Sequence, residues 1–153
     1  MNIAELVSSD VVALNVAVAS KKKALEYISE LLAQSHPDMV AAEIFDCLVS
    51  RERLGSTGIG KGIAIPHCRL QGNTETIVAM VRLQQGIDYD SIDGIPVDIL
   101  FAMLVPEDAG ETHLKALAQL AKMFSNESIL AQLHEATDAA QVCQVLDAGV
   151  STD

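Results

Sequence analysis

Residues 96–124 read PVDILFAMLVPEDAGETHLKALAQLAKMF. Val97 to Val105 is almost continuously apolar, which is typical of a β-strand buried on both faces of a sheet. Pro106 ends this strand because proline lacks the N–H that a strand ladder needs. Apolar residues then recur at helical spacing over about 111–124 and predict a helix. A buried strand followed directly by a helix favours an α/β domain.

The sequence on both sides continues this alternation. We predict strands over 11–18, 63–65 and 76–83, and helices over 21–34, 38–53, 126–135 and 138–148. Ser20 is a suitable cap for the first of these helices, and His36-Pro37 ends it. Strands interleaved with helices predict helix–sheet–helix layers. No linker, repeat or low-complexity tract divides the chain, so we expect residues 1–153 to form a single domain.

Composition and charge exclude several classes of function. Of the 153 residues, 50% are hydrophobic and only 3% are aromatic, so aliphatic side chains must build the core and few rings remain to stack on bases. The chain has 21 Asp and Glu against 10 Lys and Arg, a formal charge of −11. This field disfavours nucleic acid and anionic lipid but permits a basic protein partner.

Cysteines and hydrophobic stretches indicate the compartment. The chain has three cysteines, Cys47, Cys68 and Cys143, which are widely spaced. This odd number and spacing match neither a disulfide framework nor a zinc site, and such a pattern is typical of proteins in a reducing cytosol. The first ten residues do not resemble a signal peptide. The longest hydrophobic stretch, 95–105, is far shorter than the ~20 residues that span a bilayer. We therefore expect a cytoplasmic protein with no membrane insertion.

The loop GSTGIGKG, 55–62, is similar to a phosphate-binding P-loop. Gly55, Gly60 and Lys61 match that motif, but Gly62 replaces the hydroxyl residue that binds Mg²⁺. A P-loop also follows a strand and opens a helix, whereas this loop follows a helix and opens a strand. Nucleotide binding is therefore disfavoured. The functional alternative is a flexible or tightly turned loop that lets another molecule approach its backbone.

The acidic stretch GIDYDSIDG, 86–94, hints at a calcium-binding loop through Asp88, Asp90 and Asp93. The third carboxylate comes one place late, and the twelfth position carries no Glu. A solvated turn before the buried strand is the better interpretation, with Asp93-Gly94 as its turn dipeptide.

Two of the four histidines suggest a structural role. His36 lies at a helix end, and His134 lies in a C-terminal helix with no nearby partner in sequence. His67 differs, because it follows a glycine loop, a short strand and Pro66, a setting that presents a side chain with little freedom. That setting alone is only suggestive, since a lone histidine is more often structural.

His113 and Arg51 are the other candidates for chemistry. His113 begins the helix after the buried strand and flanks its apolar stripe, so it leans toward the protein. Arg51 continues the inward face of the helix 38–53 at its C-terminal end. A capping arginine would suffice there, whereas the functional alternative is a guanidinium beside a phosphate. Two such histidines can meet in one cleft of an α/β sheet.

Two long segments resemble a known family. RERLGSTGIGKGIAIPHCR, 51–69, is similar to the phosphohistidine segment of enzyme IIA of the sugar phosphotransferase system, fructose/mannitol class. Residues 96–124 are similar to its second signature, with the second histidine in THL. The resemblance runs from about residue 3 to 148, and the length and GSTGIG point to the nitrogen-regulatory branch. One departure is Cys68, where the family commonly has glycine; it should fit and adds sensitivity to oxidation.

The resemblance implies a fold and a set of roles. It implies a mixed sheet of roughly five strands with helices on both faces. His67 would be the phosphoryl acceptor, forming a tele-phosphohistidine, with His113 as second active-site histidine and Arg51 stabilising the phosphoryl charge. An HPr-like carrier would be the donor, and neither metal nor nucleotide would be needed.

Two outputs follow from that chemistry. The first is a phosphocarrier with regulatory output, whose phosphorylation state selects regulated protein targets. The alternative is a sugar-transport component that donates phosphate to a separate IIB protein. If phosphate were instead found on Ser56 or Thr57, the proposed site would be rejected.

Overall fold

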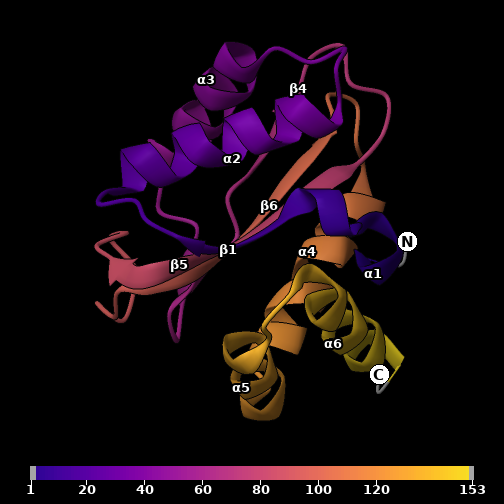
Figure 1. Ribbon diagram of the computed structural model, residues 1–153. Coiled ribbons are helices and arrows are strands. Elements are labelled where there is room, and N and C mark those ends of the chain that lie inside the picture. The colour runs from indigo at the N-terminus through magenta and orange to yellow at the C-terminus, as the bar shows by residue number, and fades with distance from the viewer. Residues whose placement is uncertain (1–2, 152–153) are drawn as a thin grey trace.

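The computed structural model describes residues 3–151, which form six strands and six α-helices (Figure 1). In chain order the elements are α1 (Ile3–Leu6), a 3₁₀ turn (Ser9–Val11), β1 (Val12–Val16), α2 (Lys21–Ser35), α3 (Ala41–Glu52), β2 (Gly58–Gly60), β3 (Ile63–Ala64), β4 (His67–Leu70), β5 (Ile77–Ile87), β6 (Val97–Pro106), α4 (Glu111–Phe124), α5 (Glu127–Glu135) and α6 (Ala139–Ser151).

The strand β6 is the centre of one mixed sheet. The order is β1-β5-β6-β3-β2, and β4 also pairs with β6. β5 runs antiparallel to β6 on one side, whereas β3 and β4 follow one another along its other side, both parallel to it. Between them the Met103 N–H donates to the Pro66 carbonyl oxygen at 2.9 Å. This bond fixes the backbone just before His67, the first residue of β4.

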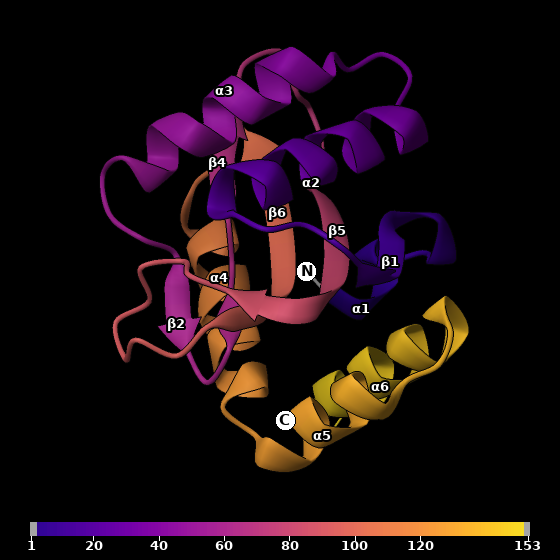
Figure 2. The ribbon, with the colours of Figure 1, turned by 60° about the vertical axis from the view of Figure 1, so that its left-hand side comes forward.

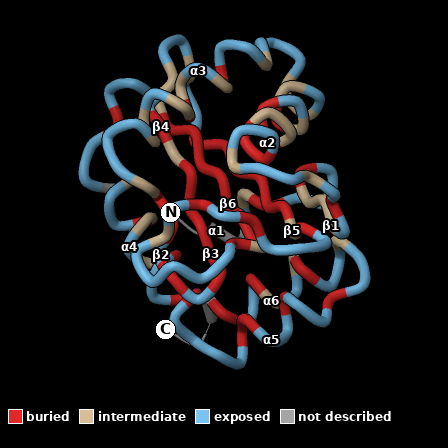
Figure 3. Tube along the Cα trace, turned by 90° about the vertical axis from the view of Figure 1, so that its left-hand side faces the viewer, coloured by how far each residue is buried: buried red, intermediate tan, exposed pale blue. Residues whose placement is uncertain are grey.

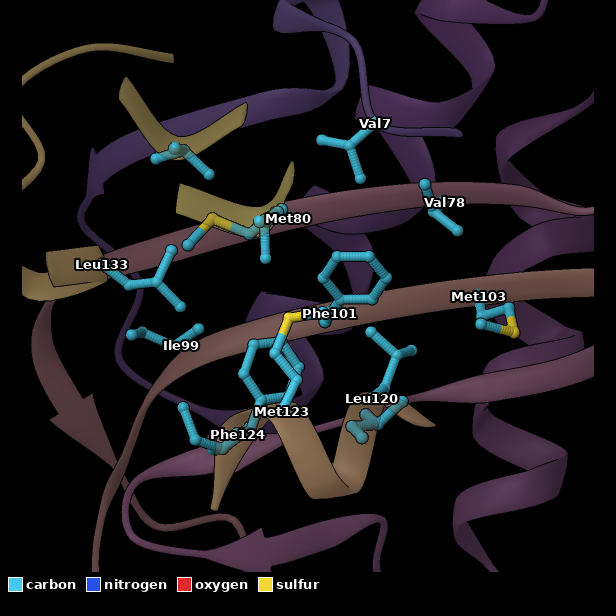
Figure 4. Packing of buried hydrophobic residues seen from close by; sticks show 14 of the residues in the cluster. Val7, Val78, Met80, Ile99, Phe101, Met103, Leu120, Met123, Phe124 and Leu133 are labelled. Atoms are coloured by element: carbon cyan, nitrogen blue, oxygen red, sulfur yellow. The ribbon is translucent and has the colours of Figure 1, made fainter. Parts of the chain in front are cut away.

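Helices cover both faces of the sheet (Figures 1 and 2). Side chains alternate along β6: Leu100 and Leu104 pack in the cluster beneath α2 and α3, whereas Phe101 and Met103 pack in the cluster shared with α4, α5 and α6. Figure 4 shows the second cluster, in which the Phe101 ring lies 5.9 Å from that of Phe124. Burial on both faces explains why the sequence of β6 is continuously apolar. Figure 3 shows the strands buried and the outer helix surfaces exposed.

The α/β prediction is confirmed, and each predicted strand and helix has a counterpart in the structure, which adds α1, β2 and β4. The sheet has six strands rather than five among the described residues, because the chain from Gly58 to Leu70 forms three short strands. His67 accordingly begins a strand instead of following the end of one. The helix predicted from residue 38 starts at Ala41, and β5 extends to Ile87. Within residues 3–151, no helix has the length and apolar character needed to cross a membrane.

The glycine loop packs against the chain's own 88–94 loop. A Cβ at Gly58 would lie 2.2 Å from Ser91 Oγ, and Gly60 has φ +99°, a conformation that L side chains rarely adopt. The Lys61 N–H donates to Asp93 Oδ2 at 2.8 Å. The close approach that Gly58 and Gly60 allow is therefore made by a neighbouring loop of the same chain, whereas a Cβ at Gly55 would have nothing within 4 Å.

Candidate functional site

The three residues singled out for chemistry line one pocket of about 520 Å³. Arg51 comes from the last turn of α3, His67 from the start of β4 and His113 from the first turn of α4. Figure 2 shows these elements on the same side of the molecule. Exposed Leu54 and Leu114 lie at the same pocket. The sequence predicted that the two histidines could meet, and the fold brings them together with Arg51.

The register of β4 explains which helix each of its side chains meets. His67 lies opposite Met103 and Cys68 lies opposite Leu104 on the parallel strand β6. Residues paired in this way point to the same face of a sheet. His67 thus shares the face covered by α4, whereas Cys68 shares the face covered by α2 and α3. A one-residue shift of register would exchange the two side chains.

The imidazole of His67 has one nitrogen bonded and the other free for chemistry. Its Nδ1 lies 2.7 Å from the carbonyl oxygen of Ile65, so Nδ1 carries the proton of the neutral ring and donates it to that oxygen. The Nε2 lone pair is then available as a nucleophile. Burial is the largest influence on the pKa of His67 and lowers it, and the nearby charge of Arg51 lowers it further. The hydrogen bond to the Ile65 carbonyl oxygen and the charge of Glu52 act in the opposite direction. The net decrease favours the neutral, nucleophilic ring.

Arg51 and His113 are each anchored within their own surroundings. The Arg51 Nη1 donates to the carbonyl oxygen of Gly55 at 2.9 Å, which holds the guanidinium over the start of the glycine loop. His113 Nδ1 lies 2.9 Å from Oγ1 of the buried Thr76. This bond orients the ring and leaves its Nε2 without a role in fixing the fold. Both groups are therefore placed where they could interact with an anion bound in the pocket.

Glu52 supports the site but was not identified from the sequence. Its carboxylate is only 5% exposed and pairs with Lys21 Nζ at 2.9 Å. It also accepts hydrogen bonds from the Tyr89 hydroxyl at 2.9 Å, the Thr57 N–H at 3.1 Å and the Thr57 hydroxyl. These partners lie on α2, on the 88–94 loop and on the glycine loop, so no local spacing in the sequence indicates them.

The Glu52 contacts account for two otherwise puzzling features. Lys21 is one of three lysines in the first turn of α2, where positive charge opposes the helix dipole. Its amine pairs with Glu52 and lies 4.5 Å from the centre of the Tyr89 ring, so tertiary contacts compensate for the position. Burial and the Glu52 charge raise the pKa of Tyr89, which stays a hydrogen-bond donor.

Arg69 joins β4 to the chain that leads into α4. Its Nη1 donates to the carbonyl oxygens of Glu107 at 3.3 Å and Ala109 at 2.5 Å. This contact fixes the approach to His113 relative to His67, two residues before Arg69. The sequence indicated nothing of it, because the two segments are about forty residues apart.

The structure contains a disulfide between Cys47 of α3 and Cys68 of β4, with a Cα–Cα distance of 6.0 Å. The expectation that the cysteines are unpaired is therefore wrong for two of them. Their separation of 21 residues gave no indication, because the pairing depends on α3 lying against β4. Cys143 is free.

The rejected motifs have structural roles. Asp93 accepts backbone N–H groups from Lys61 and Ile95, and Asp88 accepts that of Asp90, as expected of a turn. Across the part of the chain that the structure describes, no three acidic, His or Cys side chains are grouped to hold a metal ion.

The remaining histidines also bond within the fold. His36 Nδ1 bonds to the Leu32 carbonyl oxygen at the end of α2, in agreement with the predicted helix-ending role. His134 contacts Asp98 at 2.9 Å and the Leu130 carbonyl oxygen at 2.8 Å.

Comparison with known proteins identifies the family. Residues 5–149 match the family described as phosphoenolpyruvate-dependent sugar phosphotransferase system, EIIA 2. A nitrogen regulatory protein of Pseudomonas aeruginosa is 47% identical over 132 residues, covering 86% of each chain. The crystal structure of the nitrogen regulatory protein IIA-Ntr from Neisseria meningitidis superposes with a TM-score of 0.88 at 39% identity, covering 94% of this chain and 98% of that one.

A more distant structure shares the fold. The complex of enzyme IIA-mannitol with phosphorylated enzyme IIB-mannitol from Escherichia coli gives a TM-score of 0.73 at 18% identity, covering 93% of this chain and 97% of that one. The resemblance predicted from the two signature segments is confirmed by these findings. The chain belongs to the type-2 enzyme IIA family of the phosphoenolpyruvate-dependent sugar phosphotransferase system.

Proposed function

We propose that this protein accepts a phosphoryl group on Nε2 of His67 from a phosphohistidine donor, an HPr-like carrier, in the cytoplasm. The observation that carries the proposal is the 2.7 Å bond from Nδ1 of His67 to the Ile65 carbonyl oxygen, which leaves Nε2 free in the pocket. Family membership supplies the class of chemistry, and the side chains around His67 support the assignment of roles.

The transfer breaks one P–N bond and forms another. The Nε2 lone pair attacks phosphorus in line with the donor's P–N bond, whose electron pair returns to the donor imidazole. The proton of His67 stays on Nδ1, and its hydrogen bond to the Ile65 carbonyl oxygen stabilises the positive charge that the ring gains when Nε2 is phosphorylated. The lowered pKa of His67 keeps the attacking ring neutral near pH 7.

Arg51 and His113 act on the transferred group rather than as nucleophiles. Guanidinium matches phosphoryl oxygens in geometry and charge, and Arg51 lies in the same pocket as His67. His113 lies in the first turn of α4, where backbone N–H groups add positive potential. We assign both residues to stabilisation of the phosphoryl charge in the transition state.

We further propose that the output is regulatory, with the phosphorylation state of His67 selecting protein targets. Relatives at 47% and 39% identity are named nitrogen regulatory proteins, which favours this output. Transfer to a separate IIB protein is the less supported alternative. It is suggested by the mannitol complex, at 18% identity.

The chemistry is tested by incubation with phosphoenolpyruvate, an enzyme I-type kinase and an HPr-like carrier, followed by intact mass analysis. We expect the gain of one phosphoryl group that is labile in acid and stable in alkali, as a phosphoramidate is. The His67→Ala variant should remain folded and gain none. Phosphate that survives acid would place the modification on a hydroxyl and refute the assignment.

The output is tested separately by affinity capture with the phosphorylated protein, the unphosphorylated protein and His67→Ala. Partner sets that are the same in all three would contradict the regulatory output without affecting the phosphoryl chemistry.

A further inference from the structure

The disulfide forms part of the wall of the pocket that contains His67. Cys68 directly follows His67 in β4, and Cys47 lies one helical turn before Arg51 on α3. Both cysteines line the pocket together with the three candidate residues. The bond therefore joins the helix that carries Arg51 to the strand that carries the nucleophile.

The closed loop encloses nearly the whole site. Residues 48–67 contain Arg51, Glu52, all four glycines of the 55–62 loop and His67, and of the three candidates only His113 lies outside. A cross-link restricts the conformations that the enclosed chain can adopt. Without the bond, a glycine-rich segment is confined by its hydrogen bonds and packing alone.

We propose that Cys47 and Cys68 form a reversible redox modification site that sets how rigidly Arg51 is held relative to His67, and thereby the rate of phosphoryl acceptance. The coupling to rate rests on the proposed function. Disulfides of proteins in reducing compartments are usually transient and redox-sensing, which is consistent with a bond that opens and closes.

The chemistry needs a peroxide as oxidant. Cys47 is half-buried and Cys68 is 7% exposed, so Cys47 is the thiol that peroxide reaches. Its thiolate takes one peroxide oxygen to give a sulfenic acid, and the rest of the peroxide leaves as water. Attack by the Cys68 thiolate forms the S–S bond and expels a second water. Two thiols and one H₂O₂ thus give one disulfide and two H₂O, and a dithiol reductant reverses the bond.

The surroundings suit both redox states. Cys47 Sγ lies 3.3 Å from the carbonyl oxygen of Arg69, so the reduced thiol has a hydrogen-bond acceptor already in place. α3 also packs against β4 outside this bond, so we expect the two elements to stay together after reduction. The two states differ mainly in how freely residues 48–67 fluctuate, and a less rigid Arg51 lowers the fraction of encounters with productive geometry.

Cys143 provides a matched control. It lies on α6, its Sγ is 3.7 Å from the carbonyl oxygen of Val7, and burial raises the pKa of its thiol. Burial of this kind makes a thiol less reactive. The Cys143→Ser variant should leave the response to peroxide unchanged.

The experiment compares peroxide-treated and dithiothreitol-treated full-length protein, with Cys47→Ser, Cys68→Ser and Cys143→Ser. Peptide mapping after alkylation reads the bond, amide hydrogen exchange reads the mobility of residues 48–67, and initial rates with a phosphorylated, cysteine-free HPr-like donor read acceptance.

We expect the oxidised wild type and Cys143→Ser to accept phosphate about three- to tenfold faster than their reduced forms, with slower exchange in residues 48–67. The Cys47→Ser and Cys68→Ser variants cannot form the bond and should each accept phosphate at one rate, the same after peroxide as after dithiothreitol.

Failure to map a Cys47–Cys68 bond overturns the redox site. A mapped bond with equal rates, or with a slower oxidised form, overturns the coupling and leaves a bond that only stabilises the fold. If neither the oxidised nor the reduced protein accepts phosphate, the proposed function is refuted and the coupling with it. Peptide mapping still shows in that case whether the Cys47–Cys68 bond forms.

Discussion

Replacement of Glu52 by Gln should destabilise the protein by more than its position near a helix end would suggest. The substitution keeps the shape but removes the charge that Lys21 pairs with, and places an amide where four hydrogen-bond donors converge. Loss of one partner from a buried ion pair costs about 3–5 kcal/mol. Lys21 is 22% exposed and retains some water, so we expect about 2–3 kcal/mol.

This loss is measured by urea unfolding and by Tm. For a chain of this length it corresponds to a decrease in Tm of about 4–12 °C. The matched control is Glu43→Gln, the same chemical change in the first turn of the same helix, at an exposed position. That variant should change the free energy of unfolding by no more than about 0.5 kcal/mol.

Glu52→Gln should also slow phosphoryl acceptance, because Thr57 and the Gly55 carbonyl that anchors Arg51 belong to the same loop. Equal stability of the Glu52 and Glu43 variants would refute the inferred importance of the buried carboxylate. A destabilised Glu52 variant with wild-type rates would show that it supports the fold without positioning Arg51.

Three further predictions concern the site. His113→Ala and Arg51→Ala should each slow phosphoryl acceptance by about 10²–10³-fold in a time course, and the losses should be non-additive in the double variant. Unchanged rates would show that these side chains do not stabilise the transition state. The acid limb of the pH–rate profile should fall below the usual histidine pKa of about 6.5, since His67 has a lowered pKa; a midpoint above that value contradicts this. Because the pKa of His67 is lower in the folded protein, the unfolded chain binds more protons than the folded one between the two pKa values. His67 therefore contributes stability above about pH 6.5, and this contribution is lost as the pH falls toward the folded pKa. Unfolding of His67→Ala should lack this part of the pH dependence.

The order of elements could be predicted from local patterns, because α2, α4, α5 and α6 have helical periodicity and β6 is a continuous apolar run that ends at a proline. The short strands around the site could not. β2, β3 and β4 are two to four residues long and exist only through pairing with each other or with β6. His67 was therefore predicted at the end of a strand, whereas it begins one. Its position just after the short strand and Pro66 was predicted correctly.

The site could be predicted as a set of residues but not as a set of contacts. His67, His113 and Arg51 lie in recognisable segments, and the helical spacing indicated the inward face of Arg51. Their partners Ile65, Gly55 and Thr76 depend on main-chain geometry or on distant segments. The same holds for the Glu52 carboxylate and the Cys47–Cys68 bond, which require α3 to lie against β4.

The central claim, that Nε2 of His67 accepts the phosphoryl group, is tested most directly by NMR of the phosphorylated protein labelled with ¹⁵N in its histidine rings. We predict a single tele-phosphohistidine, with phosphorus coupled to Nε2 of His67 while Nδ1 keeps its proton and donates it in a hydrogen bond to the Ile65 carbonyl oxygen. Phosphorus on Nδ1 of His67, on His113 or on a hydroxyl would contradict the account.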